Sequence, residues 1–178
     1  GTFFFGARFI IADANYLVSQ NTSSVTPTTK IDRALEAVRL NPWQAEYKIF
    51  LSRLYLGRAL GELRKEESLR DQEQISKDVQ YAIAYTRGDT LEQKEITGAT
   101  ELSPNRVAAW ETLGAVYRDI KFAVGALDWG IRSFETAINL EPKNPVSYTE
   151  LGKLKVTKEE FLKAKQHFEK AVEVKPDY

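Results

Sequence analysis

The sequence repeats one six-residue pattern four times, as AVRLNP at 37–42, ATELSP at 99–104, AINLEP at 137–142 and AVEVKP at 171–176. Each copy has alanine five residues before proline and an aliphatic residue two before it. Proline lacks a backbone N–H and disfavours the helical conformation of the residue before it, so each copy predicts an abrupt helix end. The prolines lie 62, 38 and 34 residues apart. The last interval is the period of a helix–turn–helix repeat.

The residues around the first copy have the spacing of an amphipathic helix. Ile31, Leu35 and Val38 recur at helical intervals up to the first closing pattern. Thr26 followed by Pro27 is typical of a helix N-cap with proline at the first helical position. No segment alternates strictly between apolar and polar residues, as a half-buried strand would. The sequence therefore predicts an all-α fold.

Further signals mark where helices begin or break. Asn105 and Asn144 each precede a helical segment and are predicted to cap it. Gly88 predicts a kink or break, because glycine weakens a helix interior by about 1 kcal/mol relative to alanine. Thr157 and Glu160 have the spacing of a capping box, in which each side chain bonds the other residue's backbone amide.

The C-terminal half resembles the tetratricopeptide repeat (TPR) family, whose 34-residue unit has a bulky residue, Leu-Gly and Tyr on its first helix. Its second helix has Ala, Phe and Ala before a closing Pro. The matching residues are Trp110, Leu113, Gly114, Tyr117, Phe134, Ala137 and Pro142, and then Tyr148, Leu151, Gly152, Ala164, Phe168, Ala171 and Pro176. The resemblance implies that the two glycines let helices approach closely and that the aromatic residues fill the space between helices.

The same resemblance implies a right-handed solenoid of antiparallel helix pairs, forming a single array over 1–178. About four units are expected, at 1–42 (degenerate), 43–104 (with an insertion), 105–142 and 143–178. The enlarged second unit keeps Leu51, Tyr55, Ala99 and Pro104 and has Ser52 where the pattern has glycine. About a helix's length of extra sequence separates its two halves.

The resemblance also implies a groove along the first helices of the units, suited to a peptide or protein partner. The residues expected to line it are Glu46, Ile49, Arg53, Glu111, Arg118, Thr149, Lys153 and Val156, with Ala108, Ala115 and Val146 beside them. The Lys and Asn arrangement by which some TPR proteins hold a peptide's terminal carboxylate is not reproduced, since Ile49, Phe50 and Glu111 stand at the corresponding sites.

Composition argues against several other functions. Lys plus Arg and Asp plus Glu number 25 each, so the net charge is zero and no nucleic-acid partner is expected. Cysteine is absent, which excludes thiolate metal sites and thiol nucleophiles. The single histidine, His167, has no serine and acid at triad spacing. We therefore expect a non-enzymatic scaffold for protein–protein interaction, with no catalytic residue, cofactor or metal.

The first 20 residues are the most apolar part of the chain, with Phe3, Phe4, Phe5, Phe9, Ile10, Ile11, Leu17 and Val18. Arg8 and Asp13 interrupt this stretch, so no direct membrane span is expected. One interpretation is a first helix that packs on the second. The other is a segment next to a membrane span that lies outside this sequence, an expectation that the absence of methionine, including at position 1, also favours.

A second resemblance is to the soluble TPR tail of bacterial O-antigen ligase-like membrane proteins. It is carried by the segments 41–44, 101–105, 110–111, 128–129 and 148–152. It implies a soluble part of a larger bacterial membrane protein on the extracytoplasmic face. The alternatives are a free-standing adapter, which could be cytoplasmic, or an accessory domain of a glycosyl-transfer protein whose catalytic part lies elsewhere. Self-association through Trp43 and Trp129 also stays open.

Overall fold

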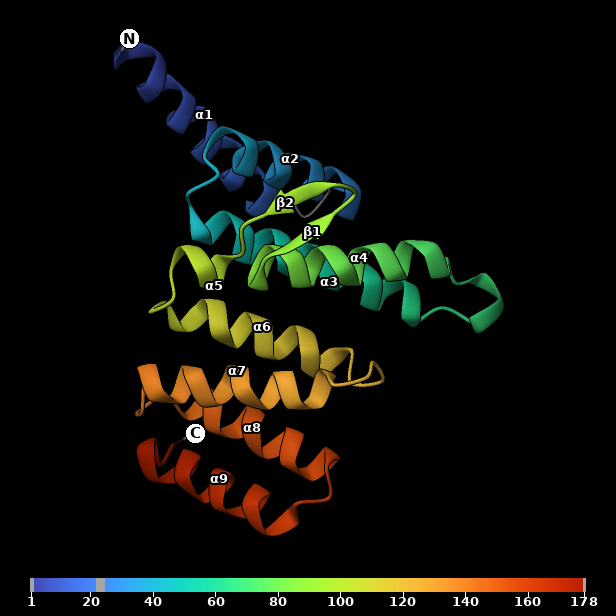
Figure 1. Cartoon of the computed structure of the whole chain (residues 1–178), viewed down its shortest axis with the longest axis vertical. Coiled ribbons are helices and arrows are strands. Elements are labelled where there is room, and N and C mark those ends of the chain that lie inside the picture. Colours follow the sequence, from blue (N-terminus) through green and yellow to red (C-terminus); the bar gives the residue numbers. More distant parts are fainter. Residues whose placement is uncertain (1, 22–24, 178) are drawn as a thin grey trace. The chain divides into compact units, whose positions relative to one another are not determined.

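The computed structural model describes residues 2–21 and 25–177, with the side chains of residues 7–20 and 25–177. Helices make up most of this part of the chain (Figure 1). Their bounds are α1 (Thr2–Asn21), α2 (Pro27–Leu40), α3 (Ala45–Leu63), the 3-10 turn η1 (Glu67–Leu69), α4 (Gln72–Arg87), α5 (Ala99–Leu102), α6 (Val107–Asp119), α7 (Ala126–Leu140), α8 (Pro145–Thr157) and α9 (Phe161–Val174). The predicted all-α class of helix-pair solenoid is confirmed.

Each of the four closing patterns ends a helix in the same way. The residue before proline donates its backbone N–H to the alanine carbonyl four residues earlier, at 2.9 Å for Asn41, Ser103 and Glu141 and at 3.2 Å for Lys175. All four of these residues have φ between −149° and −137°. The four alanines are buried. The pattern therefore marks four equivalent helix ends.

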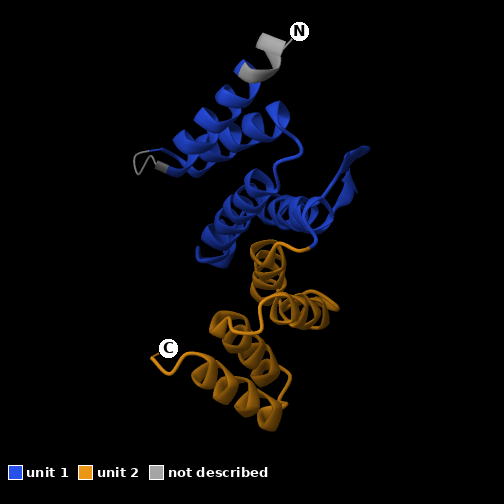
Figure 2. Ribbon diagram, turned by 90° about the vertical axis from the view of Figure 1, so that its left-hand side faces the viewer, with its two compact units in different colours: residues 1–104 blue, residues 105–178 orange. Residues whose placement is uncertain are grey.

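The chain divides into two compact units, residues 1–104 and 105–178 (Figure 2). In unit 1, α1 packs on α2, α2 on α3 and α3 on α4. In unit 2, α6 packs on α7, α7 on α8 and α8 on α9. The division between the units falls where the second predicted repeat ends and the third begins.

Each unit has its own apolar core. In unit 1, the Tyr47 ring packs with Ala12 and Ala37, and the Tyr16 ring lies 4.9 Å from it, centroid to centroid. In unit 2, the buried cluster consists of Ile131, Phe134, Leu151 and Leu154, with Leu127 and Ile138 packed against it. The second cluster joins α7 to α8, so it connects two successive helix pairs of the unit.

A β-hairpin that was not predicted from the sequence interrupts unit 1. Strand β1 (Asp89–Leu91) pairs antiparallel with β2 (Lys94–Ile96), with Thr90 opposite Glu95. The turn residues Glu92 and Gln93 have φ of 50° and 63°. Positive φ at both positions is what a two-residue type I′ turn requires. The predicted break at Gly88 is confirmed, since α4 ends at Arg87.

The hairpin lies inside the second helix of the second repeat. Ala82 and Ala99 are 17 residues apart, but without the ten residues 88–97 they would be seven apart, as Ala164 and Ala171 are. A Cβ added to Gly98 would lie 2.3 Å from the backbone N of Gly88, so the chain leaves the hairpin where it enters it. Figure 1 shows α5 beyond the C-terminal end of α4.

The same register explains the serine at the glycine position. Thr86 lies four residues after Ala82, as Phe168 lies four after Ala164. The Ser52 and Thr86 hydroxyls both donate to the Ala82 carbonyl, at 2.7 and 2.9 Å. Ser52 is larger than the glycine of the repeat pattern, and Thr86, at the phenylalanine position, is correspondingly smaller than phenylalanine.

Several predicted helix starts are confirmed and others are wrong. Thr26 and Asn144 accept backbone bonds from Thr29 and Val146, as N-caps do. Asn105 does not cap α6, because the N-cap residue is Arg106. The capping box at Thr157 is also wrong: α8 continues to Thr157, whose hydroxyl donates to the Lys153 carbonyl at 3.2 Å.

Helix α1 covers almost all of the apolar N-terminal stretch. The side chains of Phe3, Phe4 and Phe5 lie outside the described residues. Ile10, Ile11, Leu17 and Val18 are exposed, whereas Ala12 is buried against α2 and α3. In the described part of the chain, no helix has both the length and the apolarity needed to cross a membrane.

Candidate binding surfaces

Helices α6 and α8 of unit 2 carry most of the residues predicted to bind a partner, and polar side chains join the two helices. Glu111 on α6 accepts hydrogen bonds from Ser147 Oγ at 2.8 Å and from Asn144 Nδ2 at 3.0 Å. Ser147 is fully buried. Glu111 therefore holds the first turn of α8 against α6.

Arg118 makes a second link between these helices. Its guanidinium bonds both carboxylate oxygens of Asp119, at 2.7 and 3.1 Å, and pairs with Glu150 on α8. Lys153 Nζ lies 2.7 Å from the other oxygen of Glu150. Burial raises the pKa of Glu150, but its hydrogen bonds with Lys153 and Arg118 outweigh burial and lower the pKa below its ordinary value. Glu111, Arg118 and Lys153 thus all bond to other side chains of the same unit.

The outward side of α8 remains open to solvent. Val146 and Val156 are 40% and 43% exposed, and Lys153 is exposed between them. Thr149 is half-buried and donates its hydroxyl to the Pro145 carbonyl at 2.9 Å. Positions 146, 149, 153 and 156 follow the i, i+3, i+7 spacing of one helix face. This row, the α8 stripe, is an apolar surface with one central cation.

In unit 1, the three predicted groove residues of α3 lie in different environments. Glu46 is half-buried, with Tyr16 Oη 3.5 Å from its carboxylate, and Arg53 is exposed. Ile49 is fully buried, with no accessible surface, so its placement in a groove is corrected. Its buried neighbours on the same helix, Lys48 and Leu51, show that α3 is enclosed on more than one side.

The repeat-signature residues of unit 2 form the contacts between paired helices. A Cβ on Gly114 would lie 2.7 Å from the Phe134 ring, and a Cβ on Gly152 would lie 2.6 Å from the Phe168 ring. The signature residues that are buried are Leu113, Gly114, Tyr117, Phe134, Ala137, Leu151, Gly152, Ala164 and Ala171. Trp110, Tyr148 and Phe168 are half-buried, while Pro142 and Pro176 are exposed at the helix ends.

A tyrosine cluster between α3 and α4 was not identified from the sequence. The rings of Tyr55, Tyr81 and Tyr85 stack pairwise, with centroids 5.1–6.2 Å apart. Burial is the main cause that raises the pKa of Tyr85 to about 12. Tyr81 on α4 donates to Glu92 in the turn of the hairpin at 3.0 Å. The sequence does contain one indication of this cluster, since Tyr81 and Tyr85 are four residues apart and therefore lie on the same face of a helix.

A buried ion pair lies next to this cluster. Arg58 bonds both oxygens of Asp78, at 2.7 and 2.8 Å, and its guanidinium carbon lies 5.7 Å from the Tyr55 ring centroid. Asp78 has no exposed surface and also accepts from Gln74 at 2.9 Å. The pair fixes α3 to α4 and has no free oxygen for a ligand.

The hairpin and the tyrosine cluster border two adjoining pockets in unit 1, of about 310 and 260 Å³. Leu35, Tyr85, Lys94 and Ile96 line both. Arg39, Lys48 and Thr97 line the larger pocket only, and Tyr55, Tyr81, Leu91 and Glu92 line the smaller. We call the two together the hairpin pocket.

The described residues show no arrangement that points to catalysis. No group of three or more His, Asp and Glu side chains among them could hold a metal. His167 is half-buried on α9, where burial and then the charge of Lys155 lower its pKa. Both effects disfavour a charged imidazole, and no described nucleophile bonds it.

No protein-family model matches the sequence, and no curated protein matches it. Similar solved structures do exist. One is the crystal structure of TTC0263, a thermophilic TPR protein in Thermus thermophilus: the TM-score is 0.71 at 19% identity, over 93% of this chain and 74% of that chain. Another is the crystal structure of MamA, with a TM-score of 0.60 at 18% identity, over 93% of this chain and 79% of that chain.

Identities this low bear on the fold alone. A TPR fold is also what the four equivalent helix ends, the glycine–phenylalanine contacts of unit 2 and the order of the helices indicate. The chain therefore has a TPR-like fold.

Proposed function

We propose that this chain is a non-enzymatic scaffold that binds a segment of a protein partner over α6 and α8 of unit 2. The observation that carries the proposal is the α8 stripe, which leaves Val146 and Val156 exposed while the surrounding charges are paired within the unit. A partner can cover such a surface without breaking an existing ion pair. The TPR-like fold supports an interaction scaffold as the function.

Site-specific photo-cross-linking in the native host tests this proposal. Benzoylphenylalanine is placed at Val156 in one variant and at Val172 on α9, which is 51% exposed, in a control variant. We expect the same cross-linked protein band from Val156 and from a third variant at Val146, and none from Val172. Adding Lys153→Glu should abolish the band. Equal yields from Val156 and Val172 would show non-specific contact and contradict the proposal.

We further propose that the chain is the soluble part of a larger bacterial membrane protein, exposed on the extracytoplasmic side. The exposed apolar residues of α1, including Ile10, Ile11 and Leu17, support it, because they offer a surface that another segment or a bilayer could cover. A free-standing adapter and an accessory domain of an O-antigen ligase-like protein are the alternatives, the latter on its resemblance alone.

Fractionation of cells that make the full reading frame distinguishes these contexts. Retention in the membrane pellet after an alkaline wash is expected for an integral membrane protein. Recovery in the soluble fraction would contradict the membrane context and leave the free-standing adapter.

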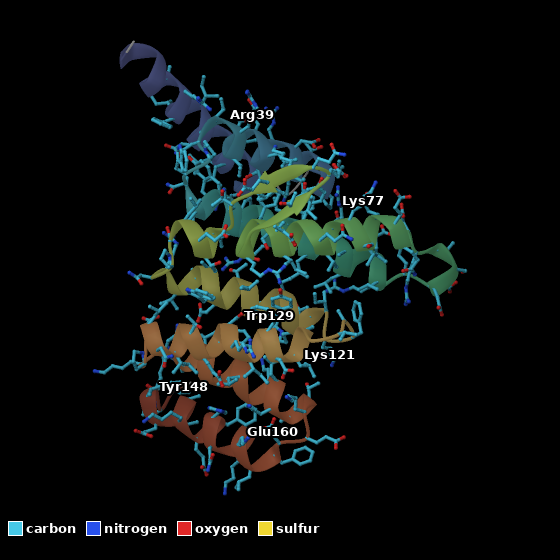
Figure 3. All side chains as sticks on the ribbon, viewed as in Figure 1. Arg39, Lys77, Lys121, Trp129, Tyr148 and Glu160 are labelled. Atoms are coloured by element: carbon cyan, nitrogen blue, oxygen red, sulfur yellow. The ribbon has the colours of Figure 1, made fainter. Side chains whose placement is uncertain are left out.

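Self-association is part of the same set of proposals. Trp43 is 75% exposed. Trp129, labelled in Figure 3, is 43% exposed, although its ring also stacks on that of Tyr117. Sedimentation of the chain and of Trp43→Ser over a range of concentrations tests it. A monomer at all concentrations would exclude it.

A further inference from the structure

The hairpin pocket lies outside the surface proposed above, and its walls have an unusual composition. One side of the hairpin faces it, because Leu91, Lys94 and Ile96 line the pocket. Pairs opposite each other in a ladder point to the same face of a hairpin, so Asp89 shares this face with Ile96. Glu95 belongs to the other face of the ladder but also lines the larger pocket. Ile96 is buried there and Leu91 is half-buried.

The larger pocket has an excess of positive charge. Arg39, Lys48 and Lys94 line it, against one carboxylate, Glu95. Arg39, on α2 (Figure 3), is paired with Glu36 at 2.6 Å. The ammonium of Lys94 has no hydrogen-bond or ion-pair partner among the described residues, although it lines both pockets.

Lys48 adds a buried cation. Lys48 is only 5% exposed, and its Nζ donates a hydrogen bond to the Thr97 carbonyl at 2.6 Å. An ammonium has three donors, and only this one bond is found for it in the described part of the chain. Burial lowers the pKa of Lys48, which an anion bound nearby would reverse.

The smaller pocket differs in being lined mainly by tyrosines and aliphatic residues: Tyr55, Tyr81, Tyr85, Leu35, Leu91 and Ile96. Lys94 and Glu92 also line it, and the Glu92 carboxylate accepts a hydrogen bond from Tyr81 at 3.0 Å. Stacked tyrosines present both ring faces and hydroxyls, the composition found where one end of a ligand is apolar and the other polar.

We propose that the hairpin pocket binds an extended acidic–aromatic peptide segment, with an acidic side chain beside Lys94 and Lys48 and the neighbouring aromatic side chain against the tyrosines. Two adjoining compartments of different chemistry fit two adjacent side chains better than one compact ion. The hairpin supplies the pocket wall without being needed to complete the repeat, since Ala82, Thr86, Ala99 and Pro104 keep repeat spacing without it. This site does not depend on the α8 stripe.

Titration of the ¹⁵N-labelled chain with acetyl-Phe-Asp-amide tests the proposal, with acetyl-Phe-Asn-amide as the neutral probe and inorganic phosphate as the bare anion. We expect saturable amide shifts at Leu91, Lys94 and Ile96, and an affinity for the acidic peptide about tenfold above that for the neutral one, since charge-assisted bonds are about twice as strong as neutral ones. Lys94→Glu should lower the affinity for the acidic peptide at least about tenfold, while Lys143→Glu, an exposed lysine in unit 2, should not change it.

Each other outcome overturns the proposal in a different way. Equal affinities for the acidic and neutral peptides would show that charge is not read. Phosphate shifts that match those of the acidic peptide would show a simple anion site. If neither the parent chain nor a folded Lys94→Glu variant shows saturable shifts with the acidic peptide, the pocket does not bind such a ligand. None of these results bears on the α8 stripe.

Discussion

A Cβ on Gly152 would lie 2.6 Å from Cε1 of Phe168, closer than any real Cβ contact allows. The two residues hold α8 and α9 together, and Gly114 and Phe134 have the same relationship between α6 and α7. Gly114 and Gly152 are therefore required by packing and not by backbone conformation, since neither has positive φ.

Substitution of these glycines should destabilise the chain despite a gain in helix propensity. Overpacking of a filled site costs about 1–3 kcal/mol, which exceeds the gain of about 0.5–1 kcal/mol from glycine to alanine in a helix. We expect Gly152→Ala to lower the free energy of unfolding, measured in urea.

The matched control is Gly57→Ala in the interior of α3. A Cβ there meets nothing within 4 Å, so only the propensity gain of about 0.5–1 kcal/mol should remain. Equal effects of the two substitutions would show that Phe168 does not pack as described.

Removal of the aromatic partner should destabilise more at Phe134 than at Phe168. Phe134 is 1% exposed and belongs to the core of unit 2. Truncation of a buried phenylalanine costs about 3–5 kcal/mol, whereas Phe168 is half-buried and should lose less. Thermal melts of Phe134→Ala and Phe168→Ala check the order, and an unchanged melt for Phe168→Ala would show that the fourth repeat is misassigned.

The ion pair of Arg58 and Asp78 should be sensitive to loss of one partner. Arg58→Ala leaves Asp78 buried with its charge unpaired, which costs about 3 kcal/mol. Replacing both residues by leucine should restore most of the lost stability. The control is Lys77→Ala on α4, which removes an exposed ion pair with Glu73 and should leave the unfolding midpoint unchanged. A larger loss of stability for Lys77→Ala than for Arg58→Ala would contradict the burial described.

Stability should decrease as pH falls through the range of histidine ionisation. Burial and Lys155 lower the pKa of His167 below its ordinary 6.5 in the folded chain. The unfolded chain therefore binds the proton first, and stability present above pH 6.5 is lost as pH falls towards the lowered folded pKa. His167 is the only histidine, so one NMR titration measures its pKa directly; a value above 6.5 would contradict the prediction, and His167→Gln should flatten the pH dependence.

The sequence predicts those parts of the fold that depend on local chemistry. The closing prolines, the Thr26 and Asn144 caps and the break at Gly88 each act within one helical turn, and all are found. The hairpin was missed because three-residue strands are too short to show alternation. Its turn also uses Glu92 and Gln93 at positive φ, without the glycine or asparagine that usually signals it.

The candidate sites were less predictable because they depend on which side chains meet. Arg118 was expected in a groove, but Asp119 and Glu150 hold it. Tyr55 and Tyr81 come together only because α4 folds back on α3. The repeat spacing from Ala82 and Thr86 to Ala99 could not be seen in the sequence, because residues 88–97 lie between them.

The central claim is that the chain is a set of TPR-like helix pairs, one of which carries an inserted hairpin. The direct test joins Arg87 to Gly98 by deleting residues 88–97. The deletion removes the Thr97 carbonyl, which accepts the hydrogen bond of the buried Lys48 ammonium, so the deletion variant also carries Lys48→Met. The chain with Lys48→Met alone is the reference. We expect a cooperative urea transition with full helical circular dichroism and a loss of no more than about 2 kcal/mol, the contribution of burying Ile96. Loss of the cooperative transition, with the reference intact, would contradict the account.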